Sequence, residues 1–370
     1  MLPYAAVYPG TFAENAQECV MMSGNSEPKA HHIILPFGKA HISHGGWFRG
    51  MNMRKILMTG CLGQIGTELT LNFRRIYGND NVVATDLVKK DVPSVTESGP
   101  FELLDVTDAK AMAALVDKYK IDTVVHLAGL LSAVGEAKPE LAYKINLGGL
   151  HNVLQIATEK RYSVFFPSSI AAFGPTTPHQ DTPQDTIQRP DTIYGITKVT
   201  GELLCDYYHK RFGIDTRGVR FPGLISYKAL PGGGTTDYAV EIYYEAVRRH
   251  AYDNCFIAEG TLMDMMYMPD ALKAVTQLLE ANPDRLIHRN AFNITAMSFA
   301  PEDVAASIKK FMPDFTIGYQ VDPIRQAIAD SWPDKLDDSC ARNEWDWKPD
   351  YDLDTMSEDM LLNLKKKLQA

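Results

Sequence analysis

A tyrosine and a lysine four residues apart form the pair of side chains best suited to acid–base chemistry. The segment Tyr194-Gly195-Ile196-Thr197-Lys198 lies in a helical pattern, so both side chains share one helical face. A phenol ordinarily titrates near pH ~10, and a neighbouring ammonium lowers that pKa because it stabilises the phenolate. The pair therefore predicts a general base, Tyr194, that is tuned by Lys198.

A pair of serines upstream could hold a reacting oxygen beside this base. The segment Pro167-Ser168-Ser169 ends an apolar, strand-like run, and Ser169 precedes Tyr194 by 25 residues. We expect Ser169 to hydrogen-bond the reacting oxygen, with Ser168 as the alternative. On its own a Tyr-x-x-x-Lys pair is more often an ordinary helix surface, so the interpretation depends on a cofactor site elsewhere in the chain.

A glycine-rich turn near residue 60 predicts that cofactor site. Glycines at 60, 63 and 66 stand between a strand-like run and a helical one. They allow a tight turn and let a pyrophosphate approach the helix N-terminus, where unpaired N–H groups favour negative charge. We expect dinucleotide contacts from the backbone of this turn: Gly60, Gly63, Gln64, Ile65 and Gly66.

Asp86 predicts which dinucleotide is bound. It ends the next strand-like run, 20 residues after Gly66. A carboxylate there accepts hydrogen bonds from both hydroxyls of the adenine ribose and repels a 2′-phosphate. The sequence therefore predicts NAD rather than NADP.

Strands and helices alternate around these motifs. Strands are expected over 55–59, 81–86, 123–128 and 164–168, and helices over 64–77, 110–120, 141–160 and, much later, 303–311. This alternation predicts an α/β fold with a Rossmann-type doubly wound parallel sheet and a smaller C-terminal substrate domain. We expect an N-terminal extension over 1–52, an NAD-binding domain over 53–225, and a mostly substrate-binding part over 226–370 that is interleaved with the sheet.

Composition and charge limit the kinds of partner that the protein is expected to bind. A net charge of −9 disfavours a nucleic-acid surface, and no apolar run reaches the ~18 residues of a membrane span. The five cysteines are far apart and none has a histidine at ligand spacing, so neither a metal site nor a disulfide framework is expected. The extension is not Arg-rich and carries several acids, so it matches a mitochondrial transit peptide poorly.

Taken together, these motifs resemble the extended branch of the short-chain dehydrogenase/reductase superfamily. The resemblance covers about residues 54 to 370 and includes a Ser-Ser-x-x-x-Phe-Gly run that begins at Ser168. It implies that Tyr194 is the general base, that Lys198 also holds the nicotinamide ribose, and that Ser169 binds the reacting oxygen. It further implies cofactor contacts from Asp105, Val106, Leu127, Ala128, Asn146, which resembles a helix-kinking asparagine of the family, and Leu224.

Within this branch the nearest competing members are the UDP-galactose 4-epimerases. Those enzymes bind a nucleotide sugar with an asparagine that follows an Arg-(aromatic)-Phe segment and clamp its phosphate with an arginine that precedes an aspartate. This chain has Arg220-Phe221-Pro222-Gly223 and Met263-Asp264-Met265 at those places. Proline and methionine cannot replace the missing charge-assisted hydrogen bonds, so a sugar nucleotide is disfavoured.

The run Leu230-Pro231-Gly232-Gly233-Gly234-Thr235-Thr236-Asp237-Tyr238-Ala239 resembles the short-chain L-threonine 3-dehydrogenases, as does Asp330-Ser331-Trp332-Pro333. The resemblance implies NAD-dependent oxidation of L-threonine to 2-amino-3-oxobutyrate, with the glycines before Thr235 closing as a lid. It places six residues near the substrate: Ser132, Ser169, Tyr194, Thr235, Thr236 and Trp332.

The same resemblance implies a setting for the enzyme. It predicts a homodimer that pairs through helices including the one with Tyr194, and functional coupling to a 2-amino-3-oxobutyrate CoA ligase. It predicts a mitochondrial location, with a cytoplasmic one as the alternative. Two other functions stay open: an NAD-dependent nucleotide-sugar epimerase or dehydratase, and a catalytically silent NAD-sensing module, which the intact Ser169, Tyr194 and Lys198 disfavour.

Overall fold

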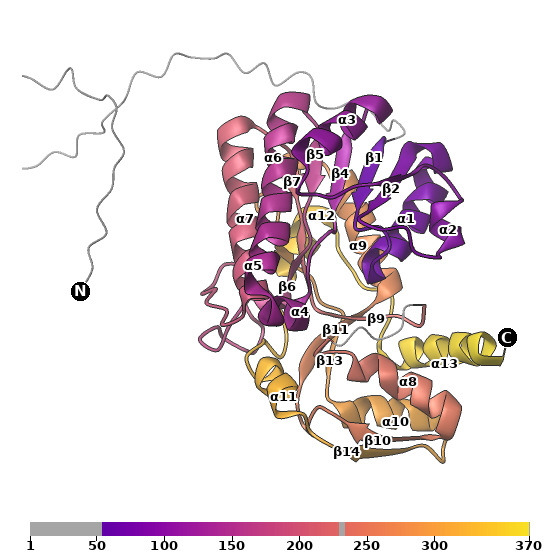
Figure 1. Ribbon diagram of the computed structural model, residues 1–370. Coiled ribbons are helices and arrows are strands. Elements are labelled where there is room, and N and C mark those ends of the chain that lie inside the picture. Colours follow the sequence, from indigo (N-terminus) through magenta and orange to yellow (C-terminus); the bar gives the residue numbers. More distant parts are fainter. Residues whose placement is uncertain (1–53, 229–233, 370) are drawn as a thin grey trace, which may run out of the picture. The chain divides into compact units, whose positions relative to one another are not determined.

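A computed structural model describes residues 54–228 and 234–369 (Figure 1). The chain divides into two units, Met1–Met51 and Asn52–Ala370. The expected extension over 1–52 and the lid glycines at 232 and 233 lie outside the described residues. In the described part of the chain, no helix is both long and apolar enough to span a bilayer.

A sheet of six parallel strands positions the site. Its order is β3-β2-β1-β4-β5-β7, and β1 pairs in parallel with both β2 and β4. The order reverses between β1 and β4, the point at which doubly wound sheets bind nucleotides. This confirms the predicted Rossmann-type fold. The strands are β1 Ile56–Thr59, β2 Val82–Asp86, β3 Phe101–Leu103, β4 Thr123–His126, β5 Ser163–Phe165 and β7 Thr216–Arg217.

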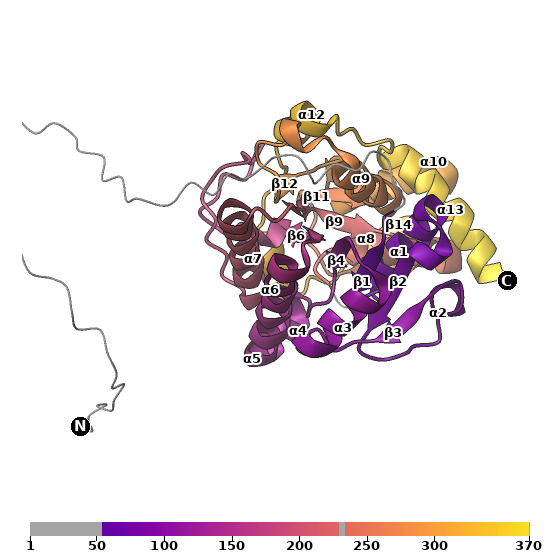
Figure 2. The same cartoon turned by 90° about the horizontal axis from the view of Figure 1, so that it is seen from above.

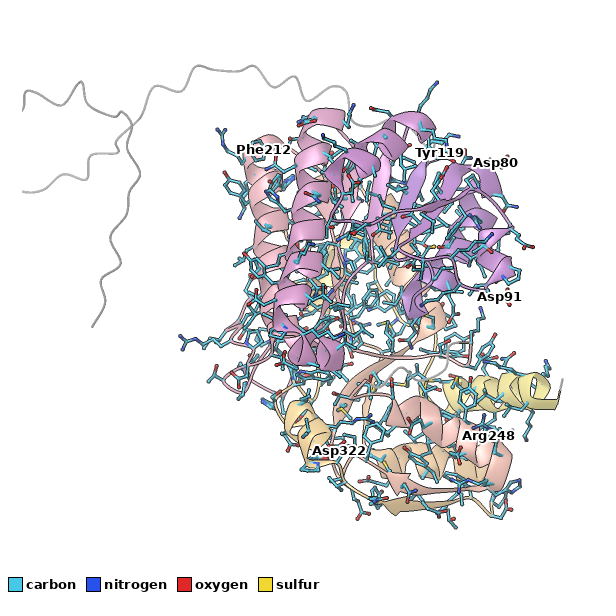
Figure 3. The ribbon with its side chains drawn as sticks, viewed as in Figure 1. Asp80, Asp91, Tyr119, Phe212, Arg248 and Asp322 are labelled. Carbon is cyan, nitrogen blue, oxygen red and sulfur yellow. The ribbon has the colours of Figure 1, made fainter. Side chains whose placement is uncertain are left out.

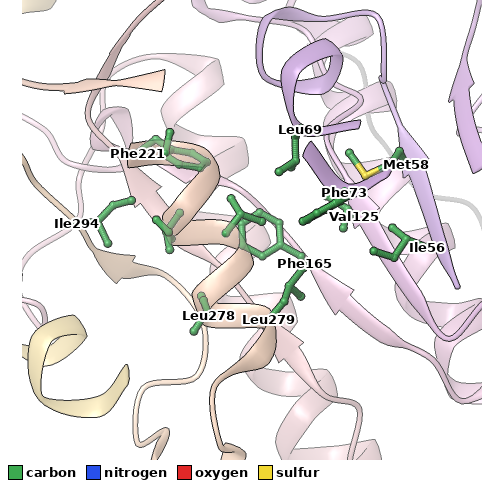
Figure 4. Packing of buried hydrophobic residues seen from close by; sticks show 14 of the residues in the cluster. Ile56, Met58, Leu69, Phe73, Val125, Phe165, Phe221, Leu278, Leu279 and Ile294 are labelled. Atoms are coloured by element: carbon green, nitrogen blue, oxygen red, sulfur yellow. The ribbon is translucent and has the colours of Figure 1, made fainter. Parts of the chain in front are cut away.

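Helices cover both faces of this sheet, as Figure 2 shows from above. Successive strand residues point to opposite faces, so Ile56 and Met58 join one core cluster and Leu57 joins another. Figure 4 shows the first cluster, in which Phe73 and Leu278 also lie. It packs beneath α1 Gln64–Tyr77 and α9 Met268–Glu280, and the second packs beneath α3 Ala109–Tyr119, α6 Gly149–Lys160 and α7 Ile193–Phe212.

Two three-stranded sheets bring together strands from later parts of the chain. Their orders are β12-β8-β6 and β13-β11-β9. The strands are β6 Ser168–Ser169, β8 Val219–Phe221, β9 Gly223–Ile225, β11 Met263–Tyr267, β12 Phe292–Asn293 and β13 Met297–Phe299. Parallel pairing of β9 with β11 joins the segment after the main sheet to a later one.

A separate hydrophobic cluster supports the remaining elements, and it includes Tyr243, Ile308 and Leu364. Figure 3 labels Arg248 and Asp322 in this region, away from Tyr119 and Phe212 at the ends of α3 and α7. The elements are α8 Tyr238–Arg249, β10 Ala251–Cys255, α10 Pro301–Phe311, β14 Thr316–Tyr319, α11 Pro323–Ala329 and α13 Leu353–Gln369. The remaining helix, α12 Ser339–Trp345, packs on the first cluster through Ala341 and Trp345. The expected domain boundary at residues 225 and 226 stays a prediction.

Two expected elements are interrupted. The strand expected over 164–168 is split between β5 in the main sheet and β6 in a short one, because Pro167 has no N–H with which to continue the ladder. The helix expected over 141–160 begins as α5 Pro139–Ala142, widens into a π-helical turn over Tyr143–Gly148 and continues as α6. Strand β3 and the short helices α2 Pro93–Thr96 and α4 Ser132–Ala137 were not expected.

Candidate functional site

The glycine turn lies where β1 ends against β4. Gly60 has a φ of +67°, which glycine adopts without strain, and a Cβ there would come within 2.7 Å of the Ala128 nitrogen. A Cβ on Gly66 would lie 2.2 Å from the Gly60 oxygen. Packing within the protein therefore requires glycine at both positions.

Gly63 is a glycine for a different reason. It precedes the first residue of α1 and is exposed, and a Cβ there would meet only the Gly60 oxygen, at an ordinary 3.4 Å. The protein's own packing leaves this position open on the side of the helix N-terminus. That is the space a pyrophosphate needs in order to approach the backbone N–H groups, so the turn fits a dinucleotide.

Asp86 ends β2 beside the turn. Its Oδ2 accepts a hydrogen bond from the Leu62 N–H at 2.9 Å, and its Oδ1 accepts one from the Leu87 N–H at 2.8 Å. Each carboxylate oxygen keeps a second lone pair for a hydroxyl donor. The carboxylate is therefore oriented by two backbone amides and can still accept from a ribose.

The other expected cofactor residues follow neighbouring strands. Asp105 lies just after β3, where the Thr107 N–H and hydroxyl lower the pKa of its carboxyl, and Val106 is buried. Leu127 and Ala128 follow β4 and are partly buried, as is Leu224 in β9. The ends of parallel strands meet at one edge of a sheet, so the fold brings the residues after β1, β2, β3 and β4 together.

Asn146 occupies the π-helical turn. Its Oδ1 accepts from the Leu130 N–H at 2.7 Å, and its Nδ2 donates to the Leu130 oxygen and the Thr197 Oγ1, both at 3.2 Å. These bonds link the loop after β4 to α7 through one amide. The expected helix kink is therefore present as a local π-helical turn.

The Tyr194 and Lys198 side chains lie together on α7. Thr192 caps the helix by accepting from the Gly195 N–H at 3.1 Å. The Lys198 Nζ lies 5.3 Å from the centre of the Tyr194 ring and donates to the Pro167 oxygen at 2.6 Å. The lysine thus joins the tyrosine to the segment that carries the two serines.

Only one of the two serines is available to a ligand. The Ser168 hydroxyl is buried and donates to Glu202. Ser169 is partly exposed, accepts from the Ala171 N–H at 3.2 Å, and its hydroxyl lowers the pKa of Tyr194 through a hydrogen bond. The geometry therefore favours Ser169 over Ser168.

The pKa values of Tyr194 and Lys198 differ from the expectation. Burial raises the pKa of Tyr194 to about 12, even with the Ser169 hydrogen bond. Burial lowers the pKa of Lys198 to about 8, and the charge of Glu202 opposes that shift. In the chain without NAD the expected lowering of the Tyr194 pKa is absent, because loss of solvation outweighs the Ser169 hydrogen bond. The lowering expected with Lys198 and bound NAD⁺ together stays a prediction.

A buried ion pair behind these residues was missed. Arg220 in β8 donates from Nε and Nη2 to the Glu202 carboxylate at 3.0 and 2.8 Å, and from Nη1 to the oxygen of Gln184 and the Oδ1 of Asn293. Both charged side chains are buried. Glu202 follows Tyr194 and Lys198 at a second interval of four, and that helical spacing was the signal that could have identified it.

The expected substrate residues fall at several places. Trp332 packs against Ile170 and Phe173, which follow Ser169. Ser132 begins α4 and is partly buried. Thr235 is buried, and Thr236 lies against Gly223, where a Cβ would meet its Cγ2 at 2.7 Å. Of these four, Trp332 packs directly on the loop after Ser169.

A C-terminal segment is joined by its backbone to the loop after Ser169. Thr182 donates its N–H to the Lys335 oxygen at 2.9 Å and accepts from the Asp337 N–H at 3.0 Å. Asn293 donates from Nδ2 to the oxygens of Thr182 and Asp337. These bonds hold the stretch that follows Trp332 beside the loop that leads to Tyr194.

Asp264 completes this junction. It is buried in β11 and accepts from the Leu336 N–H at 2.7 Å and the Thr295 hydroxyl at 2.6 Å. Burial raises the pKa of its carboxyl to about 8. Its neighbours Met263 and Met265 are buried too, so apolar side chains stand where an epimerase has its arginine.

Comparison with known proteins gives three related findings. The model of the NAD dependent epimerase/dehydratase family matches residues 56–295. An uncharacterized epimerase/dehydratase of Staphylococcus haemolyticus is 56% identical over 317 residues, which are 86% of this chain and 99% of that protein. The X-ray structure of an L-threonine dehydrogenase from Clostridium difficile has a TM-score of 0.84 and 61% identity, and the match covers 85% of this chain and 98% of the other.

A second solved structure bears on the cofactor. The holo form of a GalE-like L-threonine dehydrogenase from Cupriavidus necator has a TM-score of 0.81 and 48% identity, over 84% of this chain and all of the other.

Staphylococcus is a bacterium and has no mitochondria, so the curated relative favours the cytoplasmic alternative over the expected mitochondrial location.

Proposed function

Because the chain belongs to the NAD-dependent epimerase/dehydratase family, we propose that it oxidises the 3-hydroxyl of L-threonine to 2-amino-3-oxobutyrate, with NAD as the oxidant. The observation that carries the choice of substrate is the 61% identity to a solved L-threonine dehydrogenase over 85% of this chain. The glycine turn, Asp86 and the Ser169, Tyr194 and Lys198 group supply the parts that this reaction needs.

Each catalytic side chain has one role in the proposal. Ser169 donates a hydrogen bond to the substrate oxygen, and Tyr194 accepts the hydroxyl proton. NAD, when bound, supplies the acceptor for the hydrogen that leaves C3 with its electron pair. The pKa of about 12 for Tyr194 in the chain alone must fall for efficient base catalysis near neutral pH. The positive charges of Lys198 and of an oxidised nicotinamide both act in that direction.

The epimerase alternative is less well supported. The guanidinium of Arg220, in the segment compared above with the epimerases, is buried in its pair with Glu202. The methionines of β11 are buried too. A diphosphate needs cationic donors that these positions lack. The silent NAD-sensing module is disfavoured because the Ser169 hydroxyl is hydrogen-bonded to Tyr194 and the Lys198 ammonium lies beside the Tyr194 ring.

The proposed enzyme acts as a homodimer. Ile196, Leu203 and Tyr207 are exposed on α7, at intervals of seven and four residues that place them on one helical face. Leu141 and Tyr143 are exposed nearby, in α5 and the π-helical turn that contact α7. An apolar strip of this kind suits a two-fold interface, and the mass of the protein in solution tests it. Coupling to a CoA ligase that consumes the product rests on family resemblance alone.

The direct test follows the absorbance of reduced nicotinamide. L-threonine with NAD⁺ should give turnover, D-threonine should not, and UDP-glucose should be neither oxidised nor epimerised. Tyr194→Phe should lower turnover by roughly 10²–10⁴-fold, the usual contribution of a general base, and leave NAD binding nearly intact. Full turnover by that variant, or conversion of UDP-glucose by the wild type, would contradict the proposal.

A further inference from the structure

His288, Cys340 and Glu344 gather outside the site described above. One ligand atom from each lies within 4.8 Å of the other two. Cys340 and Glu344 are four residues apart on α12 and share a face of that helix, whereas His288 lies 52 residues before Cys340 in a turn. That distance along the chain is why the sequence alone predicted no metal site.

Glu344 holds the imidazole of His288 in one orientation. Its Oε1 is hydrogen-bonded to the His288 Nδ1, and its Oε2 accepts from the N–H groups of Ile287 and His288 at 2.6 and 3.1 Å. Glu344 is only 6% exposed. A carboxylate on one ring nitrogen places the proton there and leaves the lone pair of the other nitrogen free, the arrangement that commonly stands behind a metal-binding histidine.

The free nitrogen of His288 faces another carboxylate. Its Nε2 lies 3.5 Å from the Oδ2 of Asp185. The Asp185 side chain is 89% exposed, so a cation can reach the space between these two atoms from solvent. Tetrahedral zinc with bonds of ~2.0–2.1 Å to nitrogen and oxygen holds such a pair about 3.3 Å apart.

The thiol of Cys340 is close to the same negative charges. Its sulfur lies within 4.8 Å of a ligand atom of His288 and of Glu344. Cys340 is partly exposed and makes no disulfide. Solvent and a dissolved cation can therefore reach the sulfur.

We propose that His288 Nε2, the Cys340 sulfur and the Asp185 carboxylate bind a zinc-like divalent cation, with Glu344 orienting the imidazole from behind. A donor set of imidazole and thiolate selects zinc or cobalt over magnesium and calcium, which prefer oxygen ligands alone. A fourth position is left for water.

The proposed cation would join three segments of the fold. Asp185 comes from the loop before α7, His288 from the turn before β12, and Cys340 from α12. The adjacent Gln184 accepts from Arg220, the partner of Glu202. We therefore expect the cation to stabilise the packing around the catalytic helix and to leave the chemistry at Tyr194 unchanged.

The test uses the full chain after removal of metal with a chelator, titrated with Co²⁺ and Zn²⁺. One equivalent of Co²⁺ should give a thiolate-to-cobalt charge-transfer band, and Zn²⁺ should raise the unfolding temperature. Cys340→Ser should abolish the band and the shift, and Glu344→Gln should weaken binding by roughly 10–100-fold. Cys19→Ser is the matched control, because Cys19 precedes His31, His32, His41 and His44 outside the described residues, and it should keep both signals.

A second measurement needs no variant. Zn²⁺ should protect Cys340 from alkylation in the wild-type chain, as read by mass spectrometry of the peptides. The proposal is overturned if the cobalt band survives in Cys340→Ser, if it is lost in Cys19→Ser, or if Zn²⁺ leaves the alkylation of Cys340 unchanged.

Discussion

Gly63 is the one glycine of the dinucleotide turn that the protein's own packing does not require. A Cβ at this position would make one ordinary contact of 3.4 Å with the Gly60 oxygen, whereas a Cβ on Gly66 would overlap that oxygen at 2.2 Å. The first position serves a ligand and the second serves the helix. Substitution at the two positions should therefore separate binding from folding.

Gly63→Ala should weaken NAD binding by at least roughly tenfold, or about 1.4 kcal/mol, because the new methyl group occupies the approach of the pyrophosphate. Its unfolding free energy should change by less than about 1 kcal/mol, the scale of a changed helix cap. Gly66→Ala should lower the unfolding free energy by about 1–3 kcal/mol through overpacking. Calorimetric NAD titration and thermal unfolding measure both. Equal NAD affinity for Gly63→Ala and wild type would contradict the position proposed for the pyrophosphate at this turn.

Glu202 acts on Lys198 through its charge. Glu202→Gln leaves the buried Arg220 without its counter-charge, which should cost roughly 3–5 kcal/mol of unfolding free energy. Because the Glu202 charge raises the pKa of Lys198 against burial, its removal should lower that pKa further below about 8. NAD binding that depends on the Lys198 ammonium should then fail at lower pH than in the wild type.

Asp215→Asn is the matched control for this prediction. Asp215 pairs with Arg217 and Arg289, and it follows the end of α7 that is opposite to Tyr194. It should destabilise the fold and leave the pH dependence of NAD binding unchanged. A pH profile for Glu202→Gln that coincides with that of the wild type would reduce Glu202 to a purely structural residue.

At the scale of elements, local patterns predicted what lies beside the glycine turn. The helix expected over 64–77 is α1, and the strands expected over 55–59 and 81–86 contain β1 and β2. Alternation and glycine spacing are local signals, and they hold here because the main sheet is built from consecutive βαβ units. Tyr194 and Lys198 share a helix face for the same reason.

The features that were not predicted depend on distant partners. A helix kink at Asn146 was expected, but the hydrogen bonds of its side chain to Leu130 and Thr197 were not, and the Glu202 ion pair needs Arg220 from strand β8. The raised pKa of Tyr194 follows from burial, which three-dimensional packing determines. Helical spacing could have marked Glu202, but a periodic pattern does not identify its distant partner Arg220.

Asn146→Ala should loosen the loop after β4. The change removes three hydrogen bonds and leaves the Leu130 N–H and oxygen unsatisfied, at a cost of about 1–3 kcal/mol. Amide exchange should quicken in the loop around Leu130. Asn152→Ala, which removes one bond to the Val106 oxygen in the same helical stretch, is the control and should leave exchange at Leu130 slow. Unchanged exchange in both variants would mean that other contacts hold the loop.

At the scale of the whole molecule, Asp264 links stability to pH. Its pKa in the folded chain is about 8, above the ordinary 3.8, so its favourable contribution is present at low pH and is lost as pH rises between those values. Lys198 affects the stability over another pH range. Its pKa in the folded chain is about 8, below the ordinary 10.5, so the penalty for burying its charge is relieved only above pH ~8.

Asp264→Asn should therefore flatten the pH dependence of stability. Between pH ~4 and ~8 the unfolding temperature of the wild type should fall relative to that of the variant, because an amide in place of the carboxyl does not ionise. The amide oxygen can still accept from the Leu336 N–H, so the junction is kept. Parallel curves for the two proteins over this range would show that Asp264 ionises in the folded chain as it does in water.

The backbone bonds between Thr182 and the stretch over 335–337 bear on how the protein is made. A ribosome releases the loop that leads to Tyr194 long before Lys335 and Asp337 are translated. Until then Thr182 has neither of these partners, and Ile170 and Phe173 lack the cover of Leu336. A nascent chain can thus form its dinucleotide turn early, but it completes the loop that leads to Tyr194 only after Asp337 has been translated.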